Sequence, residues 1–281
     1  MKIVRTKSDL RRLTLGWRAA GETIGVVPTM GALHEGHLSL VSAACEQADR
    51  VIVTLFVNPK QFNNPEDLAK YPRTEESDAR KLDPFDVDLF YVPEATEIYP
   101  EGFATNISVN GVSDGLCGAN RPGHFDGVAT VVTKLLVQTD ADFAFFGEKD
   151  FQQVQVVRRV VKDLDLGCEI VGCPTVRETT GLALSSRNLR LDDAARQKAS
   201  AIYAALTDAT AMITAGQQVS NVLEQTRDKL VKGGLGPIDY LELRREHDLA
   251  LTEDPRDPAR LFVAVWLDGV RLIDNVIVRD T

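Results

Sequence analysis

Residues 24–57 read IGVVPTMGALHEGHLSLVSAACEQADRVIVTLFV, and this stretch decides the fold class. Its first apolar run, Ile24 to Pro28, predicts a short buried strand. Its last, Val51 to Val57, predicts a longer strand whose unbroken apolar character is typical of a parallel sheet covered on both faces. Between them, residues 37–49 carry apolar side chains at helical spacing. The stretch therefore predicts one strand–helix–strand unit.

The same alternation continues along the first two-thirds of the chain. We expect further strands over 87–92, 142–146 and 169–173, and helices over 67–82, 128–137 and 152–164. This order predicts an α/β domain over residues 1–175 with a Rossmann-like, doubly wound parallel sheet. Such sheets bind ligands at the carboxyl ends of their strands, so the residues that follow each strand are the candidates for function.

The pattern changes after residue 175. Helices are predicted over 192–215 and 220–232, and strands over 238–244, 259–266 and 270–278. The dipeptide Asp268-Gly269 separates the last two strands and is a strong signal for a tight antiparallel hairpin. Residues 176–281 are therefore expected to form a smaller α+β C-terminal domain.

Composition excludes several classes of protein. The 281 residues carry 32 Lys and Arg against 41 Asp and Glu, and no short stretch is rich in basic residues, so nucleic acid is not an expected partner. No apolar run approaches the length of about 18 residues that a membrane span needs, and the N-terminus lacks the apolar core of a signal peptide. The four cysteines form no C-x-x-C pair. We expect a cytoplasmic protein with free thiols and no membrane partner.

A His-x-Gly-His motif follows the first strand of this stretch. Gly31 and Gly36 are spaced like the glycines of a P-loop, but His37-Leu38 stands where Lys-Ser/Thr is required, and no G-x-G-x-x-G is present. His34 and His37 fall instead at a predicted helix N-terminus, where backbone N–H groups and imidazoles can donate hydrogen bonds to phosphate. Two alternatives stay open: a helix cap or surface pair, and a zinc pair, for which no third and fourth ligands are obvious nearby.

Uncharged amides follow the next strand. Asn58 and Gln61 are suited to hydrogen bonding a hydroxy acid, although Asn58 also fits a plain Asn-Pro turn. Residues 121–128 read RPGHFDGV, in which His124 is either a pocket residue or a structural histidine. These side chains are candidates for binding an organic substrate.

Two further motifs carry positive charge. Residues 146–153 read FGEKDFQQ and join a predicted strand to a helix; Gly147 and Asp150 fit an ordinary strand–turn–helix, but that alternative gives no reason for Lys149 between two acids. A lysine there can neutralise charge that develops on an α-phosphate or on leaving pyrophosphate. Residues 184–187 read LSSR, which is either a common loop composition or a set of two hydroxyls and a guanidinium, groups that can bind phosphate.

His-x-Gly-His after the first strand resembles the signature of the nucleotidyltransferase superfamily. The longer string PTMGALHEGH is similar to the more specific signature of the pantoate–β-alanine ligases. Five further segments resemble motifs of that family and occur in the same order: 56–62, 71–74, 121–128, 146–153 and 176–188. The resemblance implies a homodimeric enzyme that condenses pantoate with β-alanine to pantothenate through a pantoyl adenylate, using ATP and releasing AMP and pyrophosphate.

The resemblance also implies roles for individual side chains. Catalysis falls to His34, His37, Lys149, Ser185 and Arg187. ATP binding falls to Met30, Gly31, Ala32, Leu33, His34, Glu35, Gly36 and His37, to Gly147, Glu148, Lys149 and Asp150, and to Val176, Leu184, Ser185, Ser186 and Arg187. Substrate binding falls to Asn58, Gln61, His124 and Gln153. In the family, the residues that match Gln61 and Gln153 contact pantoate, and the former also lies beside the β-alanine site.

Magnesium is implied as the companion of ATP. The acidic side chain that matches the family's magnesium contact is Asp78, and Ser77 stands where some members carry a second acid. ATP oxygens and water are then expected to supply most of the magnesium ligands.

Two other functions stay open on the sequence. One is a nucleotidyltransferase that stops at a dinucleotide-like or cytidylyl product. The other is a non-catalytic nucleotide-sensing module, which would keep the site at the helix end but need neither Gln61 nor Gln153. A tRNA synthetase is disfavoured because the acidic C-terminal part has no evident anticodon-binding module.

Overall fold

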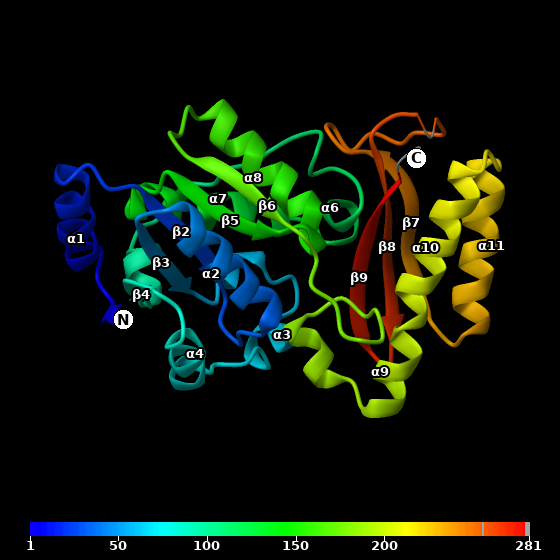
Figure 1. Cartoon of the computed structure of the whole chain (residues 1–281), viewed down its shortest axis with the longest axis horizontal. Coiled ribbons are helices and arrows are strands. Elements are labelled where there is room, and N and C mark those ends of the chain that lie inside the picture. The colour runs from blue at the N-terminus through cyan, green and yellow to red at the C-terminus, as the bar shows by residue number, and fades with distance from the viewer. Residues whose placement is uncertain (255, 279–281) are drawn as a thin grey trace. The chain divides into compact units, whose positions relative to one another are not determined.

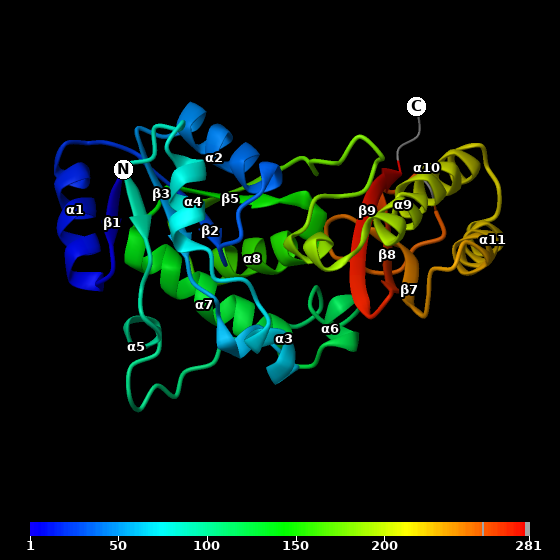
Figure 2. The same cartoon turned by 90° about the horizontal axis from the view of Figure 1, so that it is seen from below.

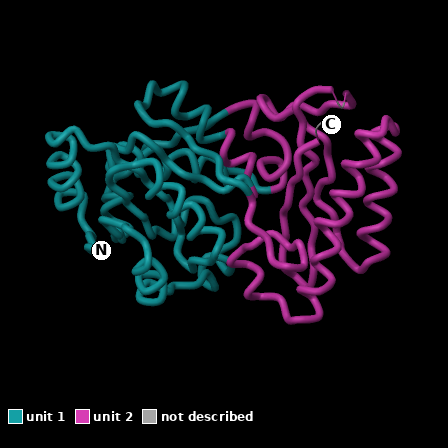
Figure 3. The backbone as a smooth tube through the Cα atoms, viewed as in Figure 1, with its two compact units in different colours: residues 1–109, 121–148, 156–174 teal, residues 110–120, 149–155, 175–281 magenta. Residues whose placement is uncertain are grey.

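The computed structural model describes residues 1–254 and 256–278, which form two compact units (Figure 3). The first unit comprises residues 1–109, 121–148 and 156–174. The second comprises residues 110–120, 149–155 and those from 175 onward. Two short segments that precede residue 175 therefore pack with the second unit.

A six-stranded parallel sheet forms the centre of the first unit (Figure 1), in the order β1-β4-β3-β2-β5-β6. The strands are β1 (Lys2–Val4), β2 (Ile24–Thr29), β3 (Arg50–Leu55), β4 (Leu89–Tyr91), β5 (Phe143–Gly147) and β6 (Glu169–Cys173). From β2 the sheet grows through β3 to β4 on one side, and through β5 to β6 on the other. The direction of winding therefore reverses between β2 and β5, and the carboxyl ends at such a switch point are where doubly wound sheets bind ligands.

Helices cover both faces of this sheet. In Figure 2, α2 (Glu35–Gln47) lies on one side of the strands, and α7 (His124–Thr139) and α8 (Phe151–Asp163) lie on the other. The other helical segments of the first unit are α1 (Lys7–Ala19), η1 (Pro59–Gln61), α3 (Pro65–Ala69), α4 (Glu75–Leu82) and α5 (Ala95–Ile98). The predicted doubly wound sheet is confirmed, and each predicted strand of this sheet is present.

Other details of the prediction were wrong. Residues 67–82 do not form one helix, because α3 ends at Ala69 and α4 begins only at Glu75. Pro72 lies between them; proline lacks the N–H that a continuous helix needs and disfavours the helical conformation of Tyr71 before it. The strand β1 and the helix α1 were not predicted. β1 has only three residues, one of them a lysine, which is too short a pattern to indicate a strand.

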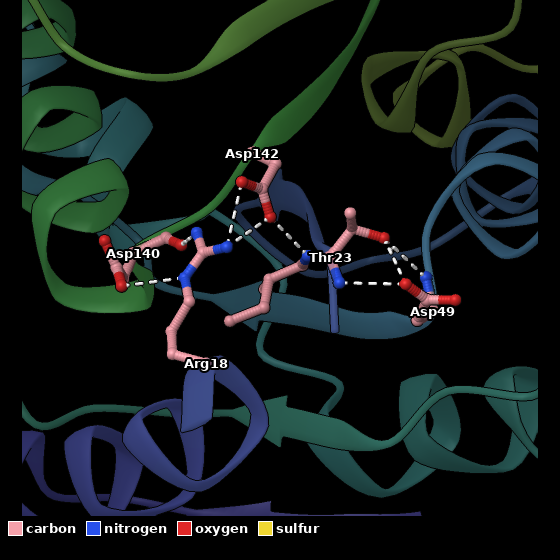
Figure 4. Close-up of polar contacts among 6 residues, drawn as sticks. Arg18, Thr23, Asp49, Asp140 and Asp142 are labelled. Atoms are coloured by element: carbon pink, nitrogen blue, oxygen red, sulfur yellow. Dashed lines mark hydrogen bonds and ion pairs between the residues drawn. The ribbon is translucent and has the colours of Figure 1, made fainter. Parts of the chain in front are cut away.

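A polar cluster ties the amino-terminal edge of the sheet together (Figure 4). Asp142, just before β5, accepts hydrogen bonds at 2.7 Å from Arg18 Nη1 and from the backbone N–H of the first residue of β2. Arg18 also donates to Asp140 at 2.9 Å, and the Thr23 hydroxyl donates to Asp49 at 2.7 Å. The starts of β2 and β5 are thereby held at the edge opposite their carboxyl ends.

The second unit is built on a three-stranded antiparallel sheet of order β7-β8-β9. Its elements are α6 (Cys117–Asn120), η3 (Ser186–Arg190), α9 (Asp193–Ala199), α10 (Ala201–Thr214), α11 (Val219–Lys232), β7 (Ile238–Arg245), β8 (Ala259–Leu267) and β9 (Val270–Val278). Asp268 and Gly269 have φ angles of 48° and 75°, the left-handed pair that a type I′ hairpin turn needs. The predicted hairpin and the smaller α+β part are confirmed.

The helix predicted over 192–215 is interrupted, because α9 ends at Ala199 and α10 begins at Ala201. The hydroxyl of Ser200 donates to the carbonyl oxygen of Gln197 at 2.7 Å. Such a bond from a serine to a carbonyl of the preceding turn bends helices. Hydrophobic periodicity does not reveal it.

Across residues 1–254 and 256–278, no helix combines the length and the apolar character that crossing a membrane requires. All four cysteines are free thiols.

Candidate active site

The β2–α2 loop, residues 30–34, leaves the sheet at the switch point and carries the first histidine. Two of its residues lie in the left-handed region, Gly31 with φ of 82° and Ala32 with φ of 51°. A residue with a side chain is uncommon and strained there, so surrounding contacts must hold Ala32 in place. Those contacts come from α4.

Asp78 of α4 holds this loop. Its side chain is fully buried, and its carboxylate accepts the backbone N–H groups of Ala32 and Leu33, each at 2.9 Å. The hydroxyl of Thr74 donates to the same carboxylate at 2.9 Å. Lys81 donates to the carbonyl oxygen of Leu33 at 2.5 Å. One helix thus satisfies both the N–H groups and a carbonyl of the loop.

This arrangement does not fit the magnesium contact expected of Asp78. Mg²⁺ is held by carboxylate oxygens that reach it in near-octahedral geometry together with several water molecules. The oxygens of Asp78 instead face three protein donors in a fully buried place. In the part of the chain that the structure describes, no group of three or more His, Cys, Asp or Glu side chains is arranged to hold a metal ion.

His34 and His37 stand at the start of α2. His34 is the N-cap residue, and its backbone N–H donates to Nδ1 of His37 at 3.4 Å. The centroids of the two rings lie 4.1 Å apart. The helix-cap alternative is therefore part of the structure, but it leaves the phosphate-binding hypothesis intact. A neutral His37 that accepts at Nδ1 carries its proton on Nε2, which is the kind of N–H donor that phosphate binding needs.

Asn58 supports the side chain of Gln61. Asn58 is only 1% exposed, and its Nδ2 donates to Oε1 of Gln61 at 3.1 Å and to the carbonyl oxygen of Gly127 at 3.0 Å. Its Oδ1 accepts the hydroxyl of Tyr99 at 2.7 Å. The amide of Gln61 also reaches the sulfur of Met30, with Nε2 3.0 Å from Sδ, so Gln61 lies beside the β2–α2 loop. Both ends of the Asn58 amide are thus engaged by the protein itself.

The RPGHFDGV segment, residues 121–128, holds the backbone of Gln61. Nδ1 of His124 donates to the Gln61 carbonyl oxygen at 2.9 Å, and Nη2 of Arg121 donates to the same oxygen at 3.2 Å. His124 is buried, and its Nε2 lies 3.1 Å from Nη1 of Arg121. At Gly127, a Cβ would lie 2.4 Å from the carbonyl oxygen of Lys60, so only glycine admits η1 this close to α7. These contacts favour the structural alternative for His124.

The FGEKDFQQ segment, residues 146–153, is divided between the two units. Gly147 ends β5 and, with Glu148, belongs to the first unit, whereas Lys149 and Asp150 belong to the second. The Lys149 side chain is 16% exposed, and its Nζ lies 3.6 Å from the carboxylate of Asp150. The carbonyl oxygen of Lys149 accepts Nδ2 of Asn275 at 3.0 Å. The lysine is therefore held by β9 through its backbone, while its ammonium keeps a weak ion pair.

Two consecutive glutamines on α8 have different environments. The buried Gln152 accepts the N–H of Cys117 at 3.0 Å and donates to the carbonyl oxygens of Val112 and Gly115 at 3.0 and 2.8 Å. Gln153, the predicted pantoate contact, is half-buried. Gln152 is therefore structural, whereas the pantoate contact expected of Gln153 stays a prediction.

The LSSR segment is anchored in the second unit. Arg177 forms a two-bond ion pair with Asp274 of β9, at 2.6 and 2.9 Å. Leu184 donates its N–H to the carbonyl oxygen of Val176 at 3.0 Å, which closes residues 176–184 into a hairpin-like loop. The Ser185 hydroxyl caps η3 by accepting the N–H of Arg187 at 3.2 Å, and Ser186 and Arg187 are half-buried.

Sequence reasoning missed four supporting residues: Thr74, Lys81, Gly127 and Asp274. The sequence signals for two of them were that Thr74 and Gly127 fall in segments 71–74 and 121–128, which resemble motifs of the family. Lys81 and Asp274 act by contacts between segments far apart in the sequence.

A model of the pantoate–β-alanine ligase family matches residues 2–277. The chain is 59% identical over 274 residues to the pantothenate synthetase of Roseobacter denitrificans. The matched region covers 98% of this chain and 96% of that protein. It is 60% identical, with the same coverage, to the pantothenate synthetase of a Chelativorans species. The chain belongs to the pantoate–β-alanine ligase family. The resemblance on which the sequence analysis relied is therefore confirmed.

Solved structures agree with this assignment to the ligase family. The crystal structure of pantothenate synthetase from Thermus thermophilus matches this ligase with a TM-score of 0.93 at 43% identity, covering 99% of this chain and 100% of that one. The pantoate–β-alanine ligase of Francisella tularensis, complexed with β-γ ATP and β-alanine, matches with a TM-score of 0.85 at 37% identity, covering 99% and 97%. The fold class and the ligase activity are both confirmed.

Proposed function

We propose that this ligase activates pantoate with ATP in one half-reaction and joins the pantoyl group to β-alanine in the other. In the first, a carboxylate oxygen of pantoate attacks the α-phosphorus of ATP as the bond to pyrophosphate breaks, which gives pantoyl adenylate. In the second, the amine of β-alanine attacks the acyl carbon, AMP leaves with the electrons of the acyl C–O bond, and the nitrogen loses a proton. Neither step needs a covalent bond to the protein.

The observation that carries this proposal is the hydrogen bond from the His34 N–H to Nδ1 of His37. It leaves the neutral His37 ring with an N–H donor at Nε2, on a loop that follows β2 at the switch point. Charge develops on the α-phosphate oxygens during adenylation, and a donor already fixed in place stabilises that charge without reorganisation. We assign His34 to the same phosphates.

Positive charge and hydroxyls are also assigned to the nucleotide. Lys149 is assigned to the α-phosphate and the leaving pyrophosphate, because a partly desolvated ammonium neutralises the charge that builds there. Ser185, Ser186 and Arg187 are assigned to the triphosphate, to which a guanidinium can bond in two places. Catalysis then rests on positioning and on charge stabilisation.

Pantoate recognition is assigned to the amides of Gln61 and Gln153. Gln61 is held from three sides, through its side chain by Asn58 and through its carbonyl by Arg121 and His124. In this proposal Asn58 and His124 act through Gln61 instead of touching the substrate. A site built from fixed amides rejects analogues that leave those amides unpaired.

Magnesium accompanies ATP in this proposal, held by triphosphate oxygens and water, and it neutralises phosphate charge. The contacts of Asp78 do not fit a role as a magnesium ligand, and the described residues contain no cluster of three or more His, Cys, Asp or Glu that could hold a metal ion. The homodimer and the cytoplasmic location predicted from the sequence stay predictions. Sedimentation of the purified chain measures the first.

Exchange of labelled pyrophosphate into ATP tests the function. We expect exchange only when ATP, magnesium and pantoate are all present, and without any need for β-alanine. Binding of ATP with no exchange under these conditions would indicate a nucleotide-sensing module. Pyrophosphate exchange that does not depend on pantoate would indicate another acceptor of the adenylyl group and contradict the proposal.

A further inference from the structure

The β2–α2 loop is folded around an internal anion. Gly31 and Ala32 are consecutive left-handed residues, and the N–H groups of Ala32 and Leu33 both turn toward Asp78. Successive backbone N–H groups in such a turn form a concave site for an anion. This site is therefore already filled by a side chain of the protein.

Both oxygens of the Asp78 carboxylate accept hydrogen bonds, from this turn and from Thr74. Oδ2 accepts the Ala32 N–H and Oδ1 accepts the Leu33 N–H, each at 2.9 Å, and the Thr74 hydroxyl donates to Oδ2 at 2.9 Å. A carboxylate with no exposed surface is stable only when its oxygens accept hydrogen bonds. Asp78 meets that condition without any bound ion.

The surroundings of the carboxylate are close-packed. A Cβ added at Gly31 would lie 3.1 Å from Oδ2 of Asp78 and 3.2 Å from Cγ of Leu55. The ammonium of Lys81, from the same helix, holds the Leu33 carbonyl oxygen at 2.5 Å. The loop, α4 and β3 thus enclose Asp78, whereas magnesium keeps several water molecules around it.

We infer that Asp78 is a positioning residue that holds the β2–α2 loop for adenylation, and that it is not a magnesium ligand. Ala32 lies two residues before His34, so the turn fixed by Asp78 sets where α2 begins and how His34 and His37 are aimed. The catalytic consequence rests on the proposed function. The hydrogen bonds of the loop do not, and they can be measured without any substrate.

Amide hydrogen exchange, followed residue by residue by NMR, tests the loop directly. In the native chain with EDTA we expect slow exchange at Ala32 and Leu33, unchanged when Mg²⁺ alone is added. In Asp78→Asn we expect both amides to exchange about 10- to 100-fold faster, as loss of charge-assisted hydrogen bonds of ordinary strength implies. Glu76→Gln is the matched control, because Glu76 is an exposed carboxylate in the first turn of the same helix.

Kinetics test the consequence for catalysis. In Asp78→Asn we expect kcat of the pantoate-dependent pyrophosphate exchange to fall about 10²-fold, as for a small misplacement of catalytic groups. The Mg²⁺ concentration at half-saturation should stay the same, which a ligand role would not allow. Lys81→Met should move kcat in the same direction by less, and Glu76→Gln should match the native chain.

Two results would overturn the inference. One is rapid exchange of Ala32 and Leu33 in EDTA that Mg²⁺ slows. The other is an Asp78→Asn variant with both amides still protected and a Mg²⁺ requirement raised tenfold or more. If Asp78→Asn does not fold, Thr74→Val replaces it, with faster exchange expected mainly at Ala32, whose N–H lies 3.1 Å from the Thr74 hydroxyl. If the Ala32 and Leu33 amides are protected but the native chain shows no pyrophosphate exchange, the proposed function is wrong and the loop assignment stands.

Discussion

Nδ1 of His124 lies 2.9 Å from the carbonyl oxygen of Gln61, and the two residues are 63 positions apart in the chain. The bond joins the start of α7 to the end of η1. Arg121 donates to the same oxygen, so the backbone of Gln61 is fixed before any substrate arrives. The proposed recognition of pantoate by Gln61 requires that the position of its amide is fixed, and Arg121 and His124 contribute to this through the Gln61 backbone.

Gly127→Ala should impair the use of pantoate. The new Cβ would lie 2.4 Å from the carbonyl oxygen of Lys60, so η1 must move and carry Gln61 with it. We expect KM for pantoate to rise about tenfold or more while KM for ATP changes little, as measured by steady-state kinetics. Gly16→Ala in α1 is the matched control: no atom lies within 4 Å of its Cβ, and kinetics should be unchanged. An unchanged KM for pantoate in Gly127→Ala would refute the proposal that the packing of η1 against α7 positions Gln61 for pantoate.

His37→Gln and His37→Ala should separate the cap from the catalysis. Glutamine at this third helical position can still accept the His34 N–H, as in a capping box, whereas alanine cannot. We expect both variants to lose adenylation rate: alanine by about 10²-fold or more, because it has no donor, and glutamine by less, because its amide keeps an N–H in a different setting from the imidazole Nε2. Only the alanine variant should also lose about 0.5–2 kcal/mol of stability in urea unfolding. Supplied pantoyl adenylate should react with β-alanine at a rate that is less affected; equal loss in both half-reactions would reduce His37 to a structural role.

Gln152→Ala and Gln153→Ala should fail in different ways. Loss of Gln152 leaves the Cys117 N–H and two loop carbonyls without their partner, which we expect to cost about 1–3 kcal/mol of stability in thermal or urea unfolding. Gln153→Ala should keep stability and ATP affinity but weaken pantoate binding, measured by separate calorimetric titrations. Loss of ATP binding in Gln153→Ala, with pantoate binding intact, would invert the assignment.

The buried thiol of Cys168 should make stability fall in alkali. Burial, with the nearby charges of Asp142 and Glu169, raises the pKa of Cys168 from about 9 to about 12. The unfolded chain then loses this proton first, so the contribution is fully present below pH 9 and is lost as pH rises from about 9 to about 12. Between pH 8 and pH 10.5 the native chain should lose about 1 kcal/mol more stability in urea than Cys168→Ala does. Parallel losses in the two chains would show that other groups govern the alkaline range.

The sequence was most informative where one segment carries the whole signal. Residues 24–57 predicted two strands and the helix between them, since burial on both faces of a parallel sheet demands continuous apolar runs. It was least informative at Pro72 and Ser200, where single residues break longer helical patterns. Periodicity did not distinguish the adjacent residues Gln152 and Gln153, because their environments depend on which way α8 faces, and only the family resemblance singled out Gln153.

By itself, the sequence determined the fold class, the family and the stretches that hold the candidate site, because periodicity and contiguous motifs are local properties of a chain. Only the tertiary structure decided what each polar side chain does. Asp78 meets Ala32 and Leu33 across 45 or more positions, and Gly127 lies against Lys60. Such contacts arise when distant segments pack together, and packing decides whether a carboxylate faces a backbone amide or an ion. The family resemblance therefore named Asp78 as a candidate, and we assign it to the loop because its buried carboxylate accepts two loop N–H groups.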